Sequence, residues 1–210
     1  MTRPAFTQEI PSGSFCLWSE IATCFVIFGI FSLLAFVICK NTVKKNFAIA
    51  TLPFCISWVA GLALLLSFGV ILMTVKGMIL ALLLLYASLS DLKTREVPDY
   101  VSIMLLILAF VGFEVSSLPS MLMGTMAVFI PQFVLALINP SRAFGGADLK
   151  ISTSLAFLLG VQKGIFALIT GLLLAVIVMA IYNRVNAKSQ KGAFPLVPFL
   201  SVGAMLAYII

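Results

Sequence analysis

Long apolar stretches with almost no charged residues are separated by short polar segments along the chain. Examples are residues 21–39, 51–75, 77–90 and 164–182. The apolar residues run continuously and do not alternate with polar ones, which favours helices over the strands of a barrel. A helix needs about 20 mostly apolar residues to cross a bilayer, where lipid offers the backbone no hydrogen bonds. The pattern therefore predicts an all-α, polytopic membrane protein.

We expect about eight transmembrane helices, separated at proline and glycine turn signals. The third and the sixth are short, which suits helices that are buried among their neighbours. Some twenty residues, including Glu9 and Glu20, precede the first apolar stretch, so we interpret the first helix as retained and not as part of a signal peptide. The expected helices lie near residues 18–39, 52–75, 77–91, 99–115, 119–138, 149–161, 164–183 and 194–210.

Composition and charge support a membrane protein and predict its orientation. The chain is 62% hydrophobic and 10% charged, whereas a soluble domain carries about a quarter charged residues. Ten of its lysines and arginines fall in one set of alternate loops and three in the other. The positive-inside rule then predicts four cytoplasmic loops and both termini outside. We interpret the basic loops as contacts with anionic membrane lipids, and we expect no nucleic-acid partner.

Several common kinds of active site are excluded by the residues that the chain lacks. It has no histidine, so histidine-based triads and general bases are excluded. Its four cysteines form no Cys-x-x-Cys pair, and no phosphate-binding loop precedes a Lys-Ser or Lys-Thr pair. Tetrahedral zinc sites need several Cys or His ligands at short spacings. We therefore expect no metal and no other cofactor.

Four of the seven acidic residues fall on the expected cytoplasmic side: Asp91, Glu96, Asp99 and Asp148. Asp99 follows Pro98 and is predicted to be a helix N-cap. Asp91 ends the third expected helix, and Asp148 precedes the sixth at the same membrane depth. Taken singly, each has a structural explanation as an interfacial charge or a cap. Brought together, one carboxyl group could hold a proton while the other activates water, as in aspartic proteases.

Two segments resemble the signatures of the type IV prepilin peptidases, GxGD-type aspartyl proteases of the bacterial inner membrane. One is Asp91 followed after six residues by Pro98-Asp99, and the other is Gly145-Gly146-Ala147-Asp148-Leu149-Lys150. The segment Phe194-Pro195-Leu196-Val197-Pro198-Phe199 also resembles the start of the family's last helix. The resemblance covers roughly residues 77–210, whose six expected helices match the family's catalytic domain.

The resemblance implies an endopeptidase that removes the leader from prepilin-like proteins at the cytoplasmic face. It makes Asp91 and Asp148 the catalytic pair, with Gly145, Gly146 and Lys150 supporting the catalytic loop. It also implies a multi-pass protein of the cell inner membrane, acting in type IV pilus assembly or protein secretion. Residues 1–76 would add two N-terminal transmembrane helices, for which no motif suggests a role.

The chain departs from the family pattern in two places. Many members have glycine where this chain has Ala147, and alanine would be strained there if the position needed a positive φ. Long members carry paired Cys-x-x-Cys motifs in a cytoplasmic region and methylate the new pilin N-terminus. Here the corresponding loop spans only residues 40–46. We therefore expect a short, peptidase-only member, as in some conjugative-plasmid and tight-adherence pilus systems.

Two other classes of function remain open from the residues alone. A small transporter or channel could use an interfacial aspartate pair to bind a cation or a proton. A noncatalytic scaffold for pilus assembly could use both residues structurally. A transporter typically has its acids near mid-membrane on discontinuous helices, whereas these acids lie at helix ends, which favours the peptidase.

Overall fold

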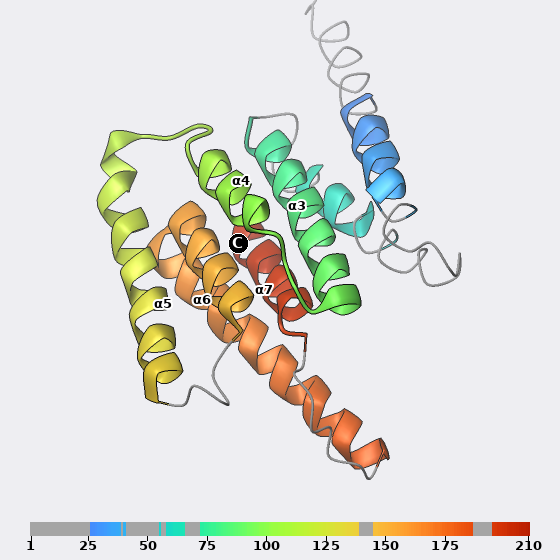
Figure 1. Cartoon of the computed structure of the whole chain (residues 1–210). Helices are drawn as coiled ribbons and strands as arrows, with labels where there is room; N and C mark the ends of the chain where they lie inside the picture. The colour runs from blue at the N-terminus through green and yellow to red at the C-terminus, as the bar shows by residue number, and fades with distance from the viewer. Residues whose placement is uncertain are drawn as a thin grey trace, which may run out of the picture.

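The computed structural model describes residues 26–38, 40, 55, 58–65, 72–138, 145–186 and 195–210. All regular structure within these residues is helical, as expected (Figure 1). The two expected N-terminal helices lie partly outside the described residues, and residues 26–38 and 58–65 are helical. The remaining elements are α3 (Leu72–Thr94), α4 (Asp99–Ala109), a 3-10 turn η1 (Val115–Ser117), α5 (Leu118–Ile138), α6 (Gly146–Asn186) and α7 (Val197–Ile209).

The helix α3 is longer than expected, because a lysine assigned to a loop lies inside it. The prediction of a short third helix was wrong: α3 has 23 residues and begins at Leu72. Lys76 is buried, and its Nζ donates hydrogen bonds to the carbonyl oxygens of Val111 (2.8 Å) and Ala109 (3.4 Å). These carbonyl groups lie at the C-terminus of α4 and just beyond it, where the helix dipole favours a cation.

The helix α4 is correspondingly shorter than expected. It ends at Ala109, not near residue 115, and the chain then turns through Phe110 and Val111. Gly112 has a φ of +66°, a conformation that glycine adopts without strain. The sequence did not indicate this turn, because residues 101–113 are almost all apolar.

The expected break between the sixth and seventh helices is found at Gly160, inside α6. Its φ of 79° and ψ of −176° are not helical, so residues on its two sides form separate helices. These two halves pack against each other, because a Cβ placed on Gly164 would lie 2.9 Å from the Cα of Ala156. The chain therefore reverses direction at Gly160 (Figure 1).

The helix α6 is the centre of the bundle. It packs against α4, α5 and α7, and α7 also packs against α3. The crossing of α7 with the second half of α6 is very close: a Cβ on Gly203 would lie only 2.4 Å from the carbonyl oxygen of Ala167. Small residues allow such contact between helices, as is common in membrane proteins.

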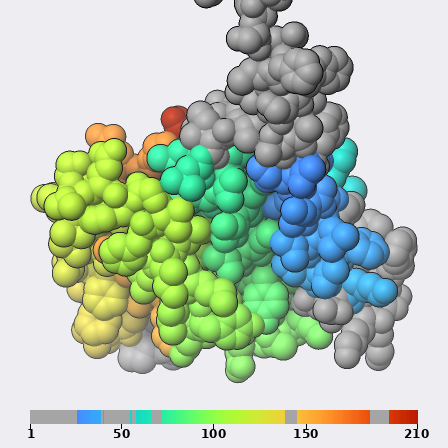
Figure 2. Space-filling view, turned by 90° about the horizontal axis from the view of Figure 1, so that it is seen from above, coloured from blue at the N-terminus to red at the C-terminus, as the bar shows by residue number. Residues whose placement is uncertain are grey.

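One hydrophobic core joins these helices and also includes residues of the N-terminal region. Phe31 and Leu64 belong to the same cluster as Leu84, Leu105 and Ile151. Figure 2 shows the helix Val26–Ile38 beside α3, with α4 and α5 toward the opposite side. The described residues Phe31 and Leu64, which precede α3, therefore pack onto the helices that follow.

Among the described residues, three helical segments are long and apolar enough to cross a membrane: Leu72–Thr94, Val115–Ile138 and Gly146–Arg184, the last of which is divided at Gly160. Shorter apolar helices are Val26–Ile38, Asp99–Ala109 and Val197–Ile209. An all-helical architecture is thus confirmed, while the number of eight spans and the side of each terminus stay predictions. In Figure 1, α3 and α5 end, and α6 and α7 begin, at the same end of the bundle.

Candidate active site

Asp91 lies in the last turn of α3, at the end of the bundle where α7 begins. Its side chain is buried, and Oδ2 accepts a hydrogen bond of 3.2 Å from the backbone N–H of Val197. Val197 is the first residue of α7, so its N–H has no partner within its own helix. The carboxylate therefore lies at the positive end of the α7 dipole, which favours negative charge.

The turn after α3 is held by backbone and hydroxyl hydrogen bonds. Arg95 has a φ of 56°, and its N–H donates to the carbonyl oxygen of Asp91 at 2.9 Å, a common helix ending. The hydroxyls of Ser90 and Thr94 donate to the carbonyl oxygen of Glu96 at 2.8 and 3.1 Å. The positive charge of Arg95 also stabilises the negative charge of the Asp91 carboxylate. The polar segment predicted to be a loop is thus an ordered turn beside this carboxylate.

Asp148 is the third residue of α6, and its carboxylate is half-buried. It accepts a hydrogen bond from the backbone N–H of Gly145, the residue before the helix. A side chain at the third helical position that reaches back to this N–H satisfies one donor at the helix start. A Cβ on Gly145 would lie 3.2 Å from Oδ2 of Asp148, so glycine leaves room for the carboxylate.

The other residues of this segment adopt unstrained conformations. Gly146 is the first residue of α6, and a Cβ placed there would meet no atom within 4 Å. Among the described residues, Arg95 is the one non-glycine residue with a positive φ. Ala147 is therefore not strained, and its replacement of the family's glycine needs no compensation from Gly146.

The structure brings Asp91 and Asp148 together from α3 and α6. The two carboxyl groups are close enough for the charge of Asp91 to act on Asp148. They are separated by 57 positions in the sequence, but Asp91 is in the last turn of α3 and Asp148 in the first turn of α6, and α3 ends where α6 begins (Figure 1). Two carboxyl groups that reach the same water molecule can divide the roles of acid and base between them.

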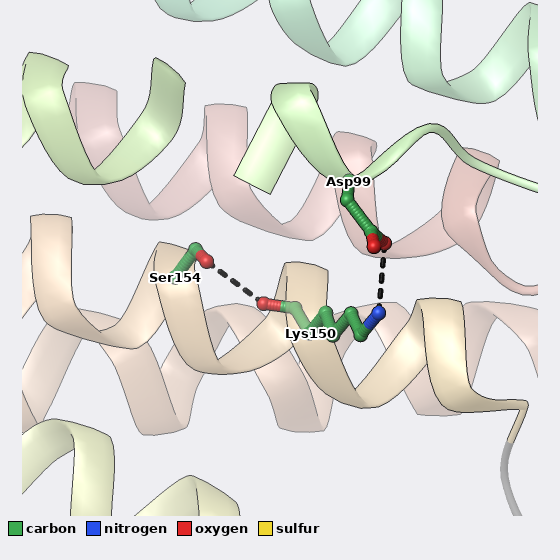
Figure 3. Close-up of polar contacts among 3 residues, drawn as sticks. All are labelled: Asp99, Lys150 and Ser154. Atoms are coloured by element: carbon green, nitrogen blue, oxygen red, sulfur yellow. Dashed lines mark hydrogen bonds and ion pairs between the residues drawn. The ribbon is translucent and has the colours of Figure 1, made fainter. Parts of the chain in front are cut away.

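Lys150 lies near this pair but binds a different acid. Its Nζ donates to Oδ1 of Asp99 at 2.7 Å, and both side chains are exposed (Figure 3). The Oγ of Ser154 donates to the carbonyl oxygen of Lys150 at 2.8 Å. The ion pair joins the start of α4, which follows the helix that carries Asp91, to the start of α6, which carries Asp148.

The prediction that Asp99 is an N-cap was wrong by one residue. Pro98 occupies the N-cap position of α4, with a φ of −60° and a ψ of 139°, and no side-chain cap is formed. Proline already adopts the extended backbone that this position needs. Asp99 is the first helical residue and is free to pair with Lys150.

A buried polar pair that the sequence motifs do not include lies between α5 and α6. The Oγ of Ser152 donates to Oε1 of Gln132 at 2.8 Å, and Gln132 is 3% exposed. One signal could have pointed to it: Gln132 is the one carboxamide residue in the apolar stretch 119–138. The contact of Asp91 with the N–H of Val197 is a backbone interaction and has no comparable side-chain signal.

Comparison with known families agrees with the two motifs. A model of the type IV leader peptidase family matches residues 78–182, which are half of the 210-residue chain. The chain belongs to the type IV leader peptidase family. The matched residues include both aspartates, while Val197 lies beyond them. No curated protein and no solved structure matches the chain.

Membership of this family confirms the resemblance that the motifs indicated, and it makes the chain a peptidase. Together with the long apolar helices it indicates a membrane protein. Across the described part of the chain, no three His, Cys, Asp or Glu side chains gather as ligands for a metal ion.

Proposed function

We propose that the chain is a membrane aspartyl endopeptidase that cleaves the leader from prepilin-like proteins at the cytoplasmic face of the inner membrane. One observation carries the proposal. In a chain of the leader peptidase family, Asp91 and Asp148 come from separate helices and are close enough for their charges to interact. We assign these two residues as the catalytic pair.

The proposed reaction needs only the two carboxyl groups, a water molecule and the peptide. One carboxylate takes a proton from the water as its oxygen attacks the scissile carbonyl carbon, and the other carboxyl group protonates the carbonyl oxygen. When the tetrahedral intermediate collapses, the C–N bond breaks and the leaving nitrogen receives a proton. A carboxylate and a new amino terminus are the products.

The orientation that we propose rests on the distribution of charge. The ten-to-three distribution of basic residues among the expected loops favours a cytoplasmic position for the ends of α3 and α5 and the starts of α6 and α7. There a leader would meet the pair at the point where its apolar segment enters the bilayer. Residues 77–210 would form the peptidase unit, with residues 1–76 adding two helices, of which Phe31 and Leu64 belong to the common core.

The test is a leader-cleavage assay on purified Asp91→Asn and Asp148→Asn variants. Each should lose cleavage by at least the 10²–10⁴-fold (order of magnitude) that general acid–base catalysis supplies, because asparagine cannot accept a proton from water. Asparagine keeps an acceptor oxygen for the N–H groups of Val197 and Gly145, so both variants should reach the membrane at normal levels. Glu114→Gln is the control, since Glu114 is exposed near η1.

Near wild-type cleavage by either aspartate variant would show that the assignment is wrong. A transporter, channel or assembly scaffold with structural aspartates would then be the better proposal. Loss of cleavage together with loss of the protein from the membrane would point to a purely structural role for the substituted residue.

A further inference from the structure

The buried face of α5 ends in a polar residue. Four residues of this helix are buried, at the spacing of one helical face, and the first three are apolar or glycine. The fourth, Gln132, follows Pro131 and is 3% exposed. Polar side chains inside apolar helices are costly and commonly mark functional sites. The buried residues of α5 are Met121, Gly124, Val128 and Gln132.

The amide of Gln132 is only half satisfied. Its Oε1 accepts the hydroxyl of Ser152, which has a second acceptor in the carbonyl oxygen of Leu149 at 3.2 Å. Its Nε2 is buried and has no hydrogen-bond partner among the residues that the structure describes. A buried donor without a partner destabilises a protein, so its presence needs an explanation.

The pair lies one helical turn from the proposed catalytic residue Asp148. Ser152 follows Asp148 by four residues, so the two lie on the same side of α6. Four residues correspond to about 6 Å along a helix. In the proposed orientation, the step from Asp148 to Ser152 leads away from the cytoplasm and into the membrane.

We propose that Gln132 and Ser152 form a subsite that hydrogen-bonds the peptide backbone of the substrate, on the apolar side of the scissile bond. This inference rests on the proposed function. A peptide bond must leave its helix to reach two carboxyl groups, and its freed backbone groups then need partners where water is scarce. An extended chain advances about 3.3 Å per residue. Gln132 Nε2 would therefore meet the carbonyl about two residues beyond the cleaved bond.

The first experiment distinguishes substrate binding by this subsite from a purely structural role, in which the Gln132–Ser152 hydrogen bond only holds α5 against α6. Gln132→Leu and Gln132→Met should lower kcat/KM for prepilin cleavage about threefold to tenfold, the value of one neutral hydrogen bond. Their thermal stability should be unchanged or higher, because a buried unpaired donor is removed and Ser152 keeps Leu149 as acceptor. Thr125→Val is the matched control, since its hydroxyl donates within α5 to Met121.

A purely structural role of this hydrogen bond predicts the opposite result. Stability would fall in both Gln132 variants, and kcat/KM per folded molecule would stay at the wild-type value. That outcome would overturn the proposal.

A second experiment tests the contact without relying on the folding of a variant. An ester replaces the substrate peptide bond whose carbonyl belongs to the second residue beyond the scissile bond, which weakens that acceptor. Wild-type kcat/KM should fall, while the same ester should have little further effect on Gln132→Leu. An ester four residues farther along serves as the control.

Equal effects of the first ester on wild type and variant would refute the contact. The activity of the wild-type enzyme distinguishes failure of the subsite from failure of the proposed function. If the wild type cleaves prepilin and Gln132→Leu has the same kcat/KM, only the subsite is wrong. If the wild type cleaves no prepilin-like peptide, the proposed function is wrong and the subsite with it.

Discussion

The reversal of the chain at Gly160 can be tested by one substitution, Gly160→Ala. Gly160 has a φ of 79° and a ψ of −176°, a region that is almost restricted to glycine. The reversal places the two halves of α6 side by side and directs the second half along α7. A side chain at this position should therefore disturb the packing that holds α7 beside Asp91.

The size of the effect follows from the local geometry. Holding alanine in this backbone region costs about 1–3 kcal/mol. Its Cβ would lie 2.8 Å from Oγ of Ser120, which accepts a hydrogen bond from the N–H of Val161 at 3.3 Å. Displacing this hydroxyl costs about 0.5–1.5 kcal/mol more. We expect the free energy of unfolding to fall by about 1.5–4.5 kcal/mol in total.

The measurement is equilibrium unfolding in detergent micelles, followed by far-ultraviolet circular dichroism. Gly29→Ala is the matched control, because a Cβ at Gly29 meets no atom within 4 Å and the residue lies in the helix Val26–Ile38. It should raise stability by about 0.5–1 kcal/mol. If α6 were one straight helix, Gly160→Ala would also raise stability, so a gain at Gly160 would refute the reversal.

Two further predictions concern the chemistry near the aspartates. Asp99→Asn should keep most of the cleavage activity, because its ion pair with Lys150 is exposed and such pairs contribute about 0–1 kcal/mol; a large loss in the same leader-cleavage assay would give Asp99 a role in substrate binding. EDTA should leave cleavage by the purified enzyme intact, since the proposed reaction uses two carboxyl groups and water, whereas inhibition that zinc reverses would contradict that mechanism.

Local sequence signals predicted those features of the fold that depend on nearby residues. The start of α5 at Leu118, one residue before the expected position, coincides with Pro119 and the polar residues around it. The break at Gly160 lies between two apolar stretches, which are separated by Gly160, Lys163 and Gly164. In both places the residues that end or begin a helix are next to it in the chain, so periodicity and turn signals were sufficient.

The errors arose where a partner lies far away in the sequence. Lys76 was assigned to a loop because a lysine in an apolar stretch is costly, but its acceptors are carbonyls 33 and 35 residues away. The partner of Asp91 is the N–H of Val197, 106 residues away. Gln132 gained importance only when α5 and α6 were placed side by side. No local pattern could indicate these contacts.

The two aspartates share a feature that explains how like charges can be held together in an apolar protein. Each carboxylate accepts a backbone N–H at the start of a helix: Asp91 from α7 and Asp148 from the residue before α6. Helix N-termini favour negative charge, so this arrangement offsets part of the repulsion between the two carboxyl groups. It also gives both residues a structural role, because replacing such an acceptor by alanine typically costs about 1 kcal/mol. Loss of activity on Asp→Ala would therefore mix folding with chemistry, whereas Asp→Asn keeps an acceptor oxygen for these N–H groups and removes the negative charge and the ability to exchange a proton with water.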